Sequence, residues 1–585
     1  MTSMTNRPIL CLPLLAAFAC GDDSTTTDSA TGTASLPATT GPDAPTSTGP
    51  DAPTGGSSSV GGTGGATGTT GGATTVAITG TDTGAATTTT GDPSTSSTTG
   101  SSGEPGTSSS GGDESTSSTT EPIDLCKVQG EGDGMIPCTD KAPPDSFEPD
   151  IQWKWFGADG NTQVVVTPAV ANLTDDNGDG VIDLCDIPDI VAVAYPGPNN
   201  VVNKGTLYLL DGATGAVHWS VPNVNAITYP AVGDIDGDGV PEIVTGRTLS
   251  ETQSGSLLVI NVDGSEKFVG PDVYNVGSAA VALADLDADG DVEIYHHATV
   301  FDHTGKLLWA VPNSEAAYVN TAADLDGDGK LEVILGPRAF HHDGSPYYTA
   351  PIGDGHPQVA DLDDDGLPEV LVITLTGLAI LEHDGTVKLA NQVPNLANYR
   401  PAAIHDLDGD LKPELAVVSA NTYASLEVNM MANWTAPVSD GGFASSTAFD
   451  FLGDGTAEAM YADESALFIF GDMGQVLLTS PRGSWTQWEN PIVADVDNDG
   501  SAEIVVVSNK GYANFTEPAI QVIRDKEDRW IPARRIWNQH AYHVTNVRED
   551  GTIPQVEPKS WELLNTFRTQ AQIAVGGGVC QPEPQ

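Results

Sequence analysis

The sequence predicts an all-β fold, a β-propeller of eight blades, and two observations carry this prediction. A nine-residue acidic motif occurs eight times, and successive copies begin 59, 51, 39, 37, 45, 44 and 45 residues apart. Each copy lies between short β-branched runs, and a second pair of apolar runs joined by an Asp-Gly or Thr-Gly turn follows most copies. Four strands in roughly 46 residues, repeated radially, make a β-propeller. Seven blades remain possible if one copy does not form a blade.

The N-terminus predicts export. Residues 1–19 hold an apolar run behind Arg7 that is too short to span a bilayer. The run ends in Ala-Phe-Ala-Cys, which resembles the lipobox of bacterial lipoproteins, although Ala17 stands where leucine is usual. The resemblance implies cleavage before Cys20, lipid on its thiol, and anchoring to the outer membrane or cell surface of a bacterium. An ordinary secretory signal cut nearby is the alternative.

A linker and a short cysteine-containing segment are expected next. Residues 20–122 are rich in Thr, Ser, Gly and Pro, and no aromatic residue occurs between Ala19 and Ser146. Such a tract cannot bury apolar area, so we expect a disordered tether. We assign residues 123–150 to an N-terminal segment, 151–530 to the propeller and 531–585 to a C-terminal cap.

Four cysteines remain after processing of an exported chain, which predicts two disulfides. They are Cys126, Cys138, Cys185 and Cys580. Four thiols permit three pairings, and we favour Cys126–Cys138, which closes a local loop, together with Cys185–Cys580.

The acidic motif has the chemistry of a loop that binds a hard cation. Calcium takes six to eight oxygen ligands, and alternate acids at positions 1, 3 and 5 converge on an ion if glycine at position 6 allows a sharp turn. A carbonyl at position 7 and an acid at position 9 complete the shell. The candidate ligands are Asp175, Asn177, Asp179 and Asp183 in copy one; Asp234, Asp236, Asp238 and Glu242 in copy two; Asp285, Asp287, Asp289 and Glu293 in copy three; Asp324, Asp326, Asp328 and Glu332 in copy four; Asp361, Asp363, Asp365 and Glu369 in copy five; Asp406, Asp408, Asp410 and Glu414 in copy six; Asp450, Asp454 and Glu458 in copy seven; and Asp495, Asp497, Asp499 and Glu503 in copy eight.

Three copies depart from the pattern. Copy one carries a further acid, Asp186, at position 12, as an EF-hand does, and we interpret residues 183–188 as an insertion before a strand at 189–194. Copy six has Leu411 in place of the glycine, and copy seven has Leu452 in place of the second ligand. We expect weak or no calcium in these last two loops.

The strand–DxDxDGxxE–strand unit resembles the FG-GAP/VCBS repeat of integrin-like propellers over about residues 160–530, although the Phe-Gly and Gly-Ala-Pro signatures are absent. The resemblance implies Ca²⁺ between the first two strands of a blade. Our main interpretation is structural calcium, in which metal binding contributes folding energy. Direct bridging to a ligand is the alternative.

Other features are less specific. The pairs His296–His297 and His341–His342, and the equally phased His303, His342 and His383, are interpreted mainly as exposed turn residues. Residues 214–219 and 304–309 are similar to repeats of quinone-dependent dehydrogenases, but the acidic loops are foreign to that family. Toward the C-terminus, residues 530–547 combine arginine with aromatic residues. We favour a structural segment that finishes the last blade and covers the ring over a recognition site for a glycan or anionic group, and we expect a helix over 559–575.

Charge and motifs restrict the function. The net charge of −57 disfavours nucleic acid as a partner, and we find no nucleophile elbow, Walker loop or HExxH. The membrane is expected to be contacted only through the lipid anchor. We expect a surface protein that binds a glycan or protein in adhesion and assign no catalytic residue, which leaves enzyme activity open. The alternatives are a calcium-dependent polysaccharide lyase and a purely structural envelope protein.

Overall fold

The computed structural model describes residues 126–128, 136–197, 205–248, 254–274, 279–311, 319–374, 376–391, 400–439, 442–509, 517–574 and 578–581. The predicted signal peptide, Cys20 and the linker lie outside the described residues. No helix in the described ranges is long and apolar enough to cross a membrane.

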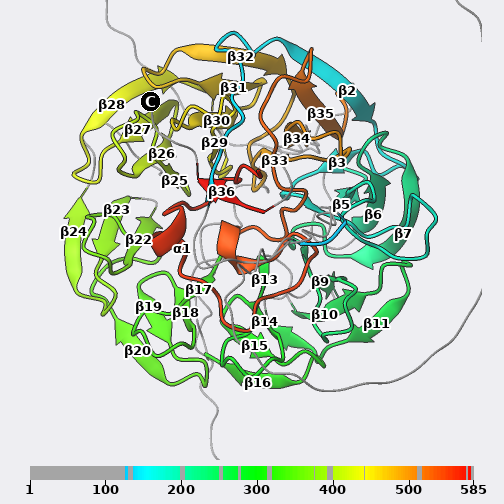
Figure 1. The fold of residues 1–585 in the computed structure, drawn as a ribbon. Coiled ribbons are helices and arrows are strands. Elements are labelled where there is room, and N and C mark those ends of the chain that lie inside the picture. Colours follow the sequence, from blue (N-terminus) through cyan, green and yellow to red (C-terminus); the bar gives the residue numbers. More distant parts are fainter. Residues whose placement is uncertain are drawn as a thin grey trace, which may run out of the picture. The chain divides into compact units, whose positions relative to one another are not determined.

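Eight antiparallel sheets form the blades of a propeller (Figure 1), which confirms the predicted fold class and the larger blade number. Blades 1 to 4 consist of β3 (Gln163–Val164), β4 (Ala169–Ala171), β5 (Asp189–Tyr195), β6 (Gly205–Asp211) and β7 (Val217–Val224); β8 (Ala231–Gly233), β9 (Glu242–Thr248), β10 (Ser254–Ile260), β11 (Glu266–Val269) and β12 (Val273–Tyr274); β13 (Val281–Ala284), β14 (Glu293–His296), β15 (Thr299–Phe301) and β16 (Leu307–Ala310); and β17 (Thr321–Ala323), β18 (Glu332–Leu335), β19 (Arg338–Phe340) and β20 (Pro346–Thr349).

Blades 5 to 7 repeat the same four-stranded plan, and blade 8 has a different origin for its outer strand. These blades consist of β21 (His356–Ala360), β22 (Glu369–Thr374), β23 (Gly377–Leu381) and β24 (Val387–Asn391); β25 (Ala403–His405), β26 (Glu414–Ser419), β27 (Thr422–Leu426) and β28 (Ala432–Pro437); β29 (Thr447–Phe449), β30 (Glu458–Ala462), β31 (Ala466–Phe470) and β32 (Val476–Pro481); and β33 (Ile492–Ala494), β34 (Glu503–Val507), β35 (Ile520–Asp525) and β2 (Pro149–Trp155).

The ring is closed by the beginning of the folded chain. Strand β2 precedes blade 1 in the sequence, yet it pairs antiparallel with β35 as the outer strand of blade 8, with Trp155 opposite Ile520. Closure in this way leaves no open gap between the first and last blades. The sequence-based expectation that the C-terminal segment completes the last blade is therefore wrong, because the outer position is already taken by β2.

Burial differs between the inner and outer strands. Every residue of β5 is buried, whereas β7 at the outside of the same blade alternates between exposed and less exposed side chains. Inner strands lie between two neighbouring blades and so read as continuous apolar runs, while outer strands keep one face in solvent. The core consists of aliphatic side chains, alanine included, together with aromatic ones, packed between successive blades.

An aromatic contact repeated around the ring joins neighbouring blades. Trp219 of blade 1 packs on the hairpin glycine Gly264 of blade 2 and donates its indole N–H to the Val262 carbonyl at 2.8 Å. Trp309 of blade 3 packs on Gly344 of blade 4 in the same way. A β-carbon on these glycines would lie within 3 Å of the indole ring. The segments 214–219 and 304–309 are thus blade-docking elements, which accounts for their Thr-Gly…Trp pattern.

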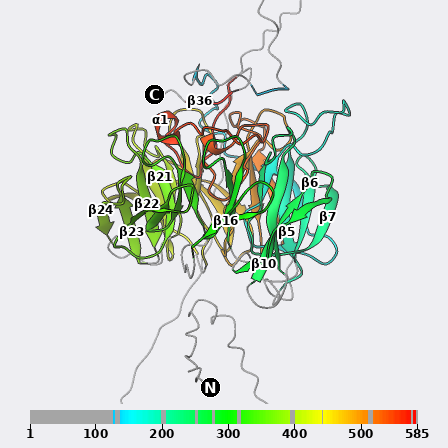
Figure 2. The same ribbon diagram turned by 90° about the horizontal axis from the view of Figure 1, so that it is seen from below.

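The C-terminal segment runs over one face of the ring, where Figure 2 shows α1 (Ser560–Leu563) and β36 (Cys580–Gln581) together. The helix expected over 559–575 is wrong beyond this single turn. Residues after it instead form isolated bridges to blades 6 and 7, through Phe567 with Ile404 and Thr569 with Ala448, and such long-range pairing overrides a weak helical pattern.

Two disulfides fix the ends of the folded chain. All four predicted cysteines are bonded, but the pairs are Cys126–Cys185 and Cys138–Cys580, so the favoured pairing is wrong. The reason is that the N-terminal segment lies on the same face of the ring as the C-terminal segment. There β1 (Ile136–Pro137) pairs parallel with β36, which brings Cys138 to Cys580.

Candidate metal centres

Every acidic motif forms the loop that precedes an inner strand of its blade, and the glutamate at position 9 accepts the N–H of position 2 in blades 2 to 8. In blade 2 the Asp234 carboxylate accepts the N–H groups of Gly237, Asp238 and Gly239 at 2.8–3.2 Å. Glu242 opens the second strand, and its Oε2 accepts the N–H of Ile235 at 3.2 Å. These bonds curl the backbone so that alternate side chains converge, as the sequence predicted.

Position 4 of the motif is a feature that the sequence reasoning missed. This residue has positive φ in all eight loops, and it is glycine in five of them. The other three are Ala288, Asp364 and Asn498. Asn and Asp are the residues that tolerate this conformation best after glycine, and this preference is the signal that could have revealed the position.

The side chains at positions 1, 3 and 5 gather in the loops of blades 2 and 3. Ligand atoms of Asp234, Asp236 and Asp238 lie within 4.8 Å of one another, and the equivalent atoms of blade 3 do the same. Two unit charges at 4 Å repel by about 4 kcal/mol near a protein surface. Such a cluster therefore favours a bound cation, and the all-oxygen donor set suits calcium better than softer metals.

Unpartnered carboxylate oxygens provide a test of whether an ion fits. Glu414 Oε1, Glu503 Oε1 and Asp495 Oδ1 are buried and have no hydrogen-bond donor within the described part of the chain. A buried anionic oxygen without a partner is costly. The loops of blades 6 and 8 thus fit an oxygen-ligated divalent ion, which would supply the missing partner for these atoms.

Burial also raises the pKa of the glutamates at position 9 in blades 2 to 8. The pKa of Glu293 and that of Glu414 rise to about 8, and that of Glu332 rises to about 7, in each case chiefly through desolvation. Nearby aspartates add to the rise for Glu293 and Glu414, whereas the His341 hydrogen bond opposes it for Glu332. Without a cation, these groups keep their protons to a higher pH than exposed glutamates do.

These shifts predict how the metal-depleted protein responds to pH. The pKa of each of these carboxyls is higher in the folded state than its unfolded value of about 4.5. Each carboxyl therefore contributes stability below about pH 4.5, and this contribution is lost as the pH rises through the folded pKa of about 7 to 8. We therefore expect the melting temperature of metal-depleted protein to fall between pH 5 and pH 8. Circular dichroism melts across this range measure it, and a melting temperature that rises with pH would contradict the assignment. Saturating calcium is the control, because ligand deprotonation then favours binding.

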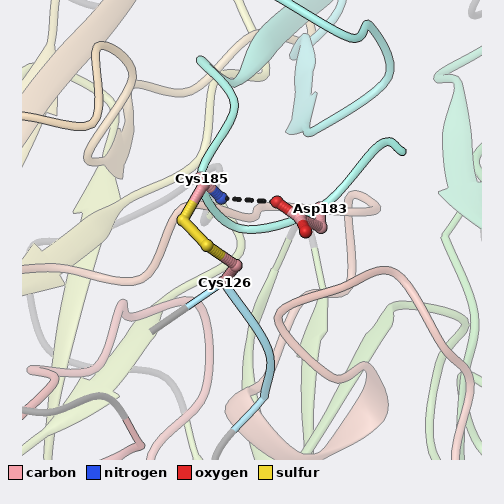
Figure 3. Close-up of side chains that lie close together, drawn as sticks. All are labelled: Cys126, Asp183 and Cys185. Atoms are coloured by element: carbon pink, nitrogen blue, oxygen red, sulfur yellow. Dashed lines mark hydrogen bonds between the residues drawn. A yellow bond between two sulfur atoms is a disulfide. The ribbon is translucent and has the colours of Figure 1, made fainter. Parts of the chain in front are cut away.

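The loop of blade 1 is built differently from the others. Asp175 accepts the N–H groups of Gly178 and Gly180, as expected, but Asp183 accepts the N–H of Cys185 at 2.9 Å (Figure 3). The buried Asp186 accepts the N–H of Asp176 at position 2, at 3.1 Å, which is the contact that glutamate makes elsewhere. Asp186 thus takes the place of the ninth residue, and the disulfide Cys126–Cys185 lies beside it.

A histidine and three acids at blade 1 form a group that the sequence reasoning missed. Atoms of Asp176, Asp211 and His218 lie within 4.8 Å of one another, and His218 Nε2 lies 3.1 Å from the buried Asp189 Oδ1. The hydrogen bond to Asp189 raises the pKa of His218. Asp189 opens β5 after the inserted residues, so its role is hidden until the strand boundary is known.

The loop of blade 6 retains the common conformation in spite of Leu411. The Leu411 N–H bonds to Asp406 Oδ2 at 2.8 Å, and Leu411 has φ of 70° with its side chain exposed. A β-carbon in this left-handed conformation costs about 1–2 kcal/mol, so the loop tolerates the leucine at a cost in stability.

We expect Leu411→Gly to raise the free energy of unfolding by up to about 1 kcal/mol, since the strain removed exceeds the extra chain entropy of glycine. Urea unfolding in calcium measures the change. Gly366→Leu in blade 5 is the reciprocal variant: its φ is 84° and a β-carbon there meets no atom within 4 Å, so it should destabilise by conformation alone. A destabilised Leu411→Gly would contradict this explanation.

The loop of blade 7 uses its leucine for packing. Leu452 is buried, and its carbonyl accepts the N–H of Ala142 from the N-terminal segment at 2.8 Å. Asp450 and Glu458 are likewise buried, and desolvation raises the pKa of both, that of Asp450 to about 6. The N-terminal segment therefore covers this loop, which explains why an apolar residue replaces the third-position ligand.

The C-terminal segment contacts the acidic loops around the ring. Gln555 donates to the Ala288 carbonyl of blade 3 at 2.9 Å, and Asn565 donates to the Asp361 carbonyl of blade 5 at 2.7 Å. Arg535 donates to the Leu184 carbonyl and to Asn498, so it joins the loops of blades 1 and 8. The loops thus hold the cap in place.

The aromatic and basic residues of 530–547 are largely committed to this cover. Trp537 and Tyr542 are buried and stack at 4.4 Å, and Arg534 donates to the Tyr542 hydroxyl and to two backbone carbonyls. Buried side chains cannot reach an external ligand, so the geometry favours the structural interpretation of this segment.

The histidines singled out in the sequence occupy unlike environments. His296 and His297 are buried in blade 3, so the interpretation of this pair as exposed turn residues is wrong. His341 Nδ1 lies 2.9 Å from Glu332 Oε1 at the blade 4 loop, and His303 and His342 lie 3.7 and 4.0 Å from acids of the blade 3 loop. His383 makes no ion pair within the described ranges. The histidines do not form one shared centre.

A cavity of about 570 Å³ opens where the N-terminal segment, the first two acidic loops and the C-terminal segment meet. Its lining includes Lys127 and Arg548 together with Asp183 and Asp550. Charges of both signs beside apolar side chains suit a polar ligand.

Comparisons with known proteins support the fold. No known family profile matches the sequence, and no curated protein matches it, so the resemblance to FG-GAP/VCBS repeats remains a prediction. The biofilm matrix protein Bap1 of V. cholerae is similar in structure, with a TM-score of 0.62, 21% identity, and coverage of 75% of this chain and 100% of that chain. Rhamnogalacturonan lyase YesW has a TM-score of 0.47 and 15% identity over 75% and 84% of the two chains. The fold and the comparisons together place the chain among eight-bladed β-propellers. It carries two disulfides, and its acidic clusters could hold metal ions.

Proposed function

We propose that this chain is an exported, lipid-anchored, calcium-binding propeller of the bacterial surface that acts in adhesion by binding a glycan or a protein. Its lipid would be carried on Cys20, and the Thr/Ser-rich linker would hold the ring away from the membrane. Calcium in the acidic loops would be mainly structural.

The observation that carries the proposal is the closed eight-bladed ring with its ends fixed by disulfides. Bonds of this kind are stable in the oxidising environment outside the cell, and a biofilm matrix protein has the same architecture along its whole length. Such a ring offers a rigid surface for recognition.

A glycan array and immobilised bacterial matrix polysaccharides test this proposal with the biotinylated mature chain. We expect retention in calcium and loss of retention after chelation, since the ring should then loosen. Failure to bind any glycan or surface protein would contradict the adhesion proposal. If the chain also cleaves no polysaccharide, a purely structural envelope protein is favoured.

The cavity with Lys127 and Arg548 is the observation that favours the second candidate, a polysaccharide lyase. A lyase needs a base beside a site for an acidic sugar, and basic side chains can serve in both roles. The test is the release of unsaturated uronate from polysaccharides, measured by ultraviolet absorbance. If the natural chain releases uronate and Lys127→Gln and Arg548→Gln abolish this release, the lyase replaces adhesion as the proposed function. Lys559→Gln, on the cap beside Glu562, is the matched control.

A further inference from the structure

One position on the outer strand differs in charge from blade to blade. It is the third residue after the turn residue that has positive φ, for example Lys267 after Gly264. In blades 1 to 7 this residue is His218, Lys267, Leu308, Tyr347, Lys388, Asn433 and Leu477, and β2 places Gln152 beside the loop of blade 8.

In blades 2 and 5 the residue is a lysine that reaches into the acidic loop of its own blade. Lys267 Nζ lies 2.5 Å from Asp236 Oδ2 and 2.7 Å from Glu242 Oε1. Lys388 Nζ contacts Asp363 and lies 2.8 Å from Glu369 Oε1. In both blades the ammonium group therefore joins the carboxylates at positions 3 and 9.

The lysine contacts use the oxygens that a metal ion would need. Calcium in such a loop takes oxygens at 2.3–2.6 Å, including side chains at positions 3 and 9. An ammonium within 3 Å of the same oxygens would stand next to a divalent ion and repel it. The lysine ammonium group and a calcium ion thus compete for the same carboxylate oxygens.

The loops of blades 6 and 8, whose acids pair with no lysine in the described ranges, leave carboxylate oxygens unpartnered. In blade 6, Asn433 contacts only Asp408 at 3.3 Å, and the buried Glu414 Oε1 has no donor among the described residues. In blade 8, Gln152 contacts only Asp497 at 2.6 Å, and Glu503 Oε1 is likewise unpartnered. A neutral amide orients one carboxylate but does not offset the charge of the loop.

We propose that this outer-strand position divides the loops into two classes. The loops of blades 2 and 5 are neutralised by their own lysine and bind calcium weakly, whereas those of blades 6 and 8 bind it tightly. For blade 6 this replaces the weak binding expected from Leu411, because the loop keeps the common conformation. The inference rests on the proposed role of calcium and adds which loops carry it. The ring thereby depends on calcium in some blades and is independent of it in others.

The test counts calcium ions per chain by equilibrium dialysis and elemental analysis, from about 1 µM to 1 mM free calcium. We expect the double variant Lys267→Gln, Lys388→Gln to gain two ions at the low end of the range, with affinity in those loops raised about tenfold or more, since a neighbouring unit charge is worth at least 1.4 kcal/mol at this distance. Asn433→Lys should lose one ion.

Lys306→Gln is the matched control, because Lys306 lies on the corresponding hairpin of blade 3 and makes no ion pair with a loop acid within the described ranges. It should leave both the ion count and the affinities unchanged. A double lysine variant with the same count and affinities as the natural chain would overturn the lysine proposal while leaving calcium in the other loops intact. A natural chain that binds no calcium would overturn both, and neither result depends on glycan or protein binding.

Discussion

Removal of calcium is expected to lower the melting temperature of the folded ring by about 10–15 °C. The loops of blades 1, 3, 6 and 8, whose acids pair with no lysine within the described ranges, would each lose about 2.7 kcal/mol when calcium falls from 100-fold above its dissociation constant to zero. For a folded body of about 430 residues, a total of about 10 kcal/mol corresponds to a shift of this size. Carboxylates drawn together by the fold would then repel one another without an ion between them.

The measurement is a calorimetric melt of the mature chain at neutral pH, in calcium and after dialysis against a chelator. Magnesium is the control ion. It demands a tighter octahedral shell, so we expect it to restore only part of the stability. An unchanged midpoint in chelator would contradict the role assigned to the loops.

Loss of the Cys138–Cys580 disulfide has the second largest expected effect. The bond joins residues 442 positions apart, and closing so long a loop in the unfolded chain corresponds to about 5–6 kcal/mol in the chain-entropy account. Cys138→Ser, Cys580→Ser should therefore destabilise the protein strongly. It would also release β1 from β36, whose pairing joins the two ends.

The other disulfide provides the matched control. Cys126–Cys185 spans 59 positions, for which the same account gives about 4 kcal/mol. Guanidinium unfolding of both double-serine variants in calcium measures the difference. A smaller loss for Cys138→Ser, Cys580→Ser than for Cys126→Ser, Cys185→Ser would contradict the entropic explanation.

The repeated elements could be predicted from sequence because their signals are local. The spacing of the eight motifs and the strands around them predicted the blades, and glycine at position 6 predicted a turn that the structure contains in Gly239 and its equivalents. Even the exception is instructive, since Leu411 adopts the same left-handed conformation as those glycines.

Features that depend on long-range contact could not be predicted in the same way. The outer strand of blade 8 comes from β2, hundreds of residues before its partner β35, and no local pattern marks a strand for that place. The disulfide pairs follow from where the N-terminal segment lies on the ring. The role of Leu452 likewise depends on its contact with Ala142.

The candidate metal centres likewise have a part that is local in sequence and a part that depends on the fold. Positions 1, 3, 5 and 9 of each loop could be proposed as ligands from spacing alone. Their charged neighbours come from other strands or turns, and only the fold places them beside the acids. These neighbours are Lys267, Lys388, His341 and Asp189. Charge balance in each loop is therefore a property of the blade rather than of the motif.

The most direct test of calcium in the loops is a crystal structure of the folded ring grown in calcium, with anomalous scattering recorded to locate the ions. We predict anomalous peaks inside the loops of blades 6 and 8, within 2.3–2.6 Å of the aspartates and of Glu414 and Glu503. Loops in which these carboxylates contact only water or protein groups at saturating calcium would contradict the central claim.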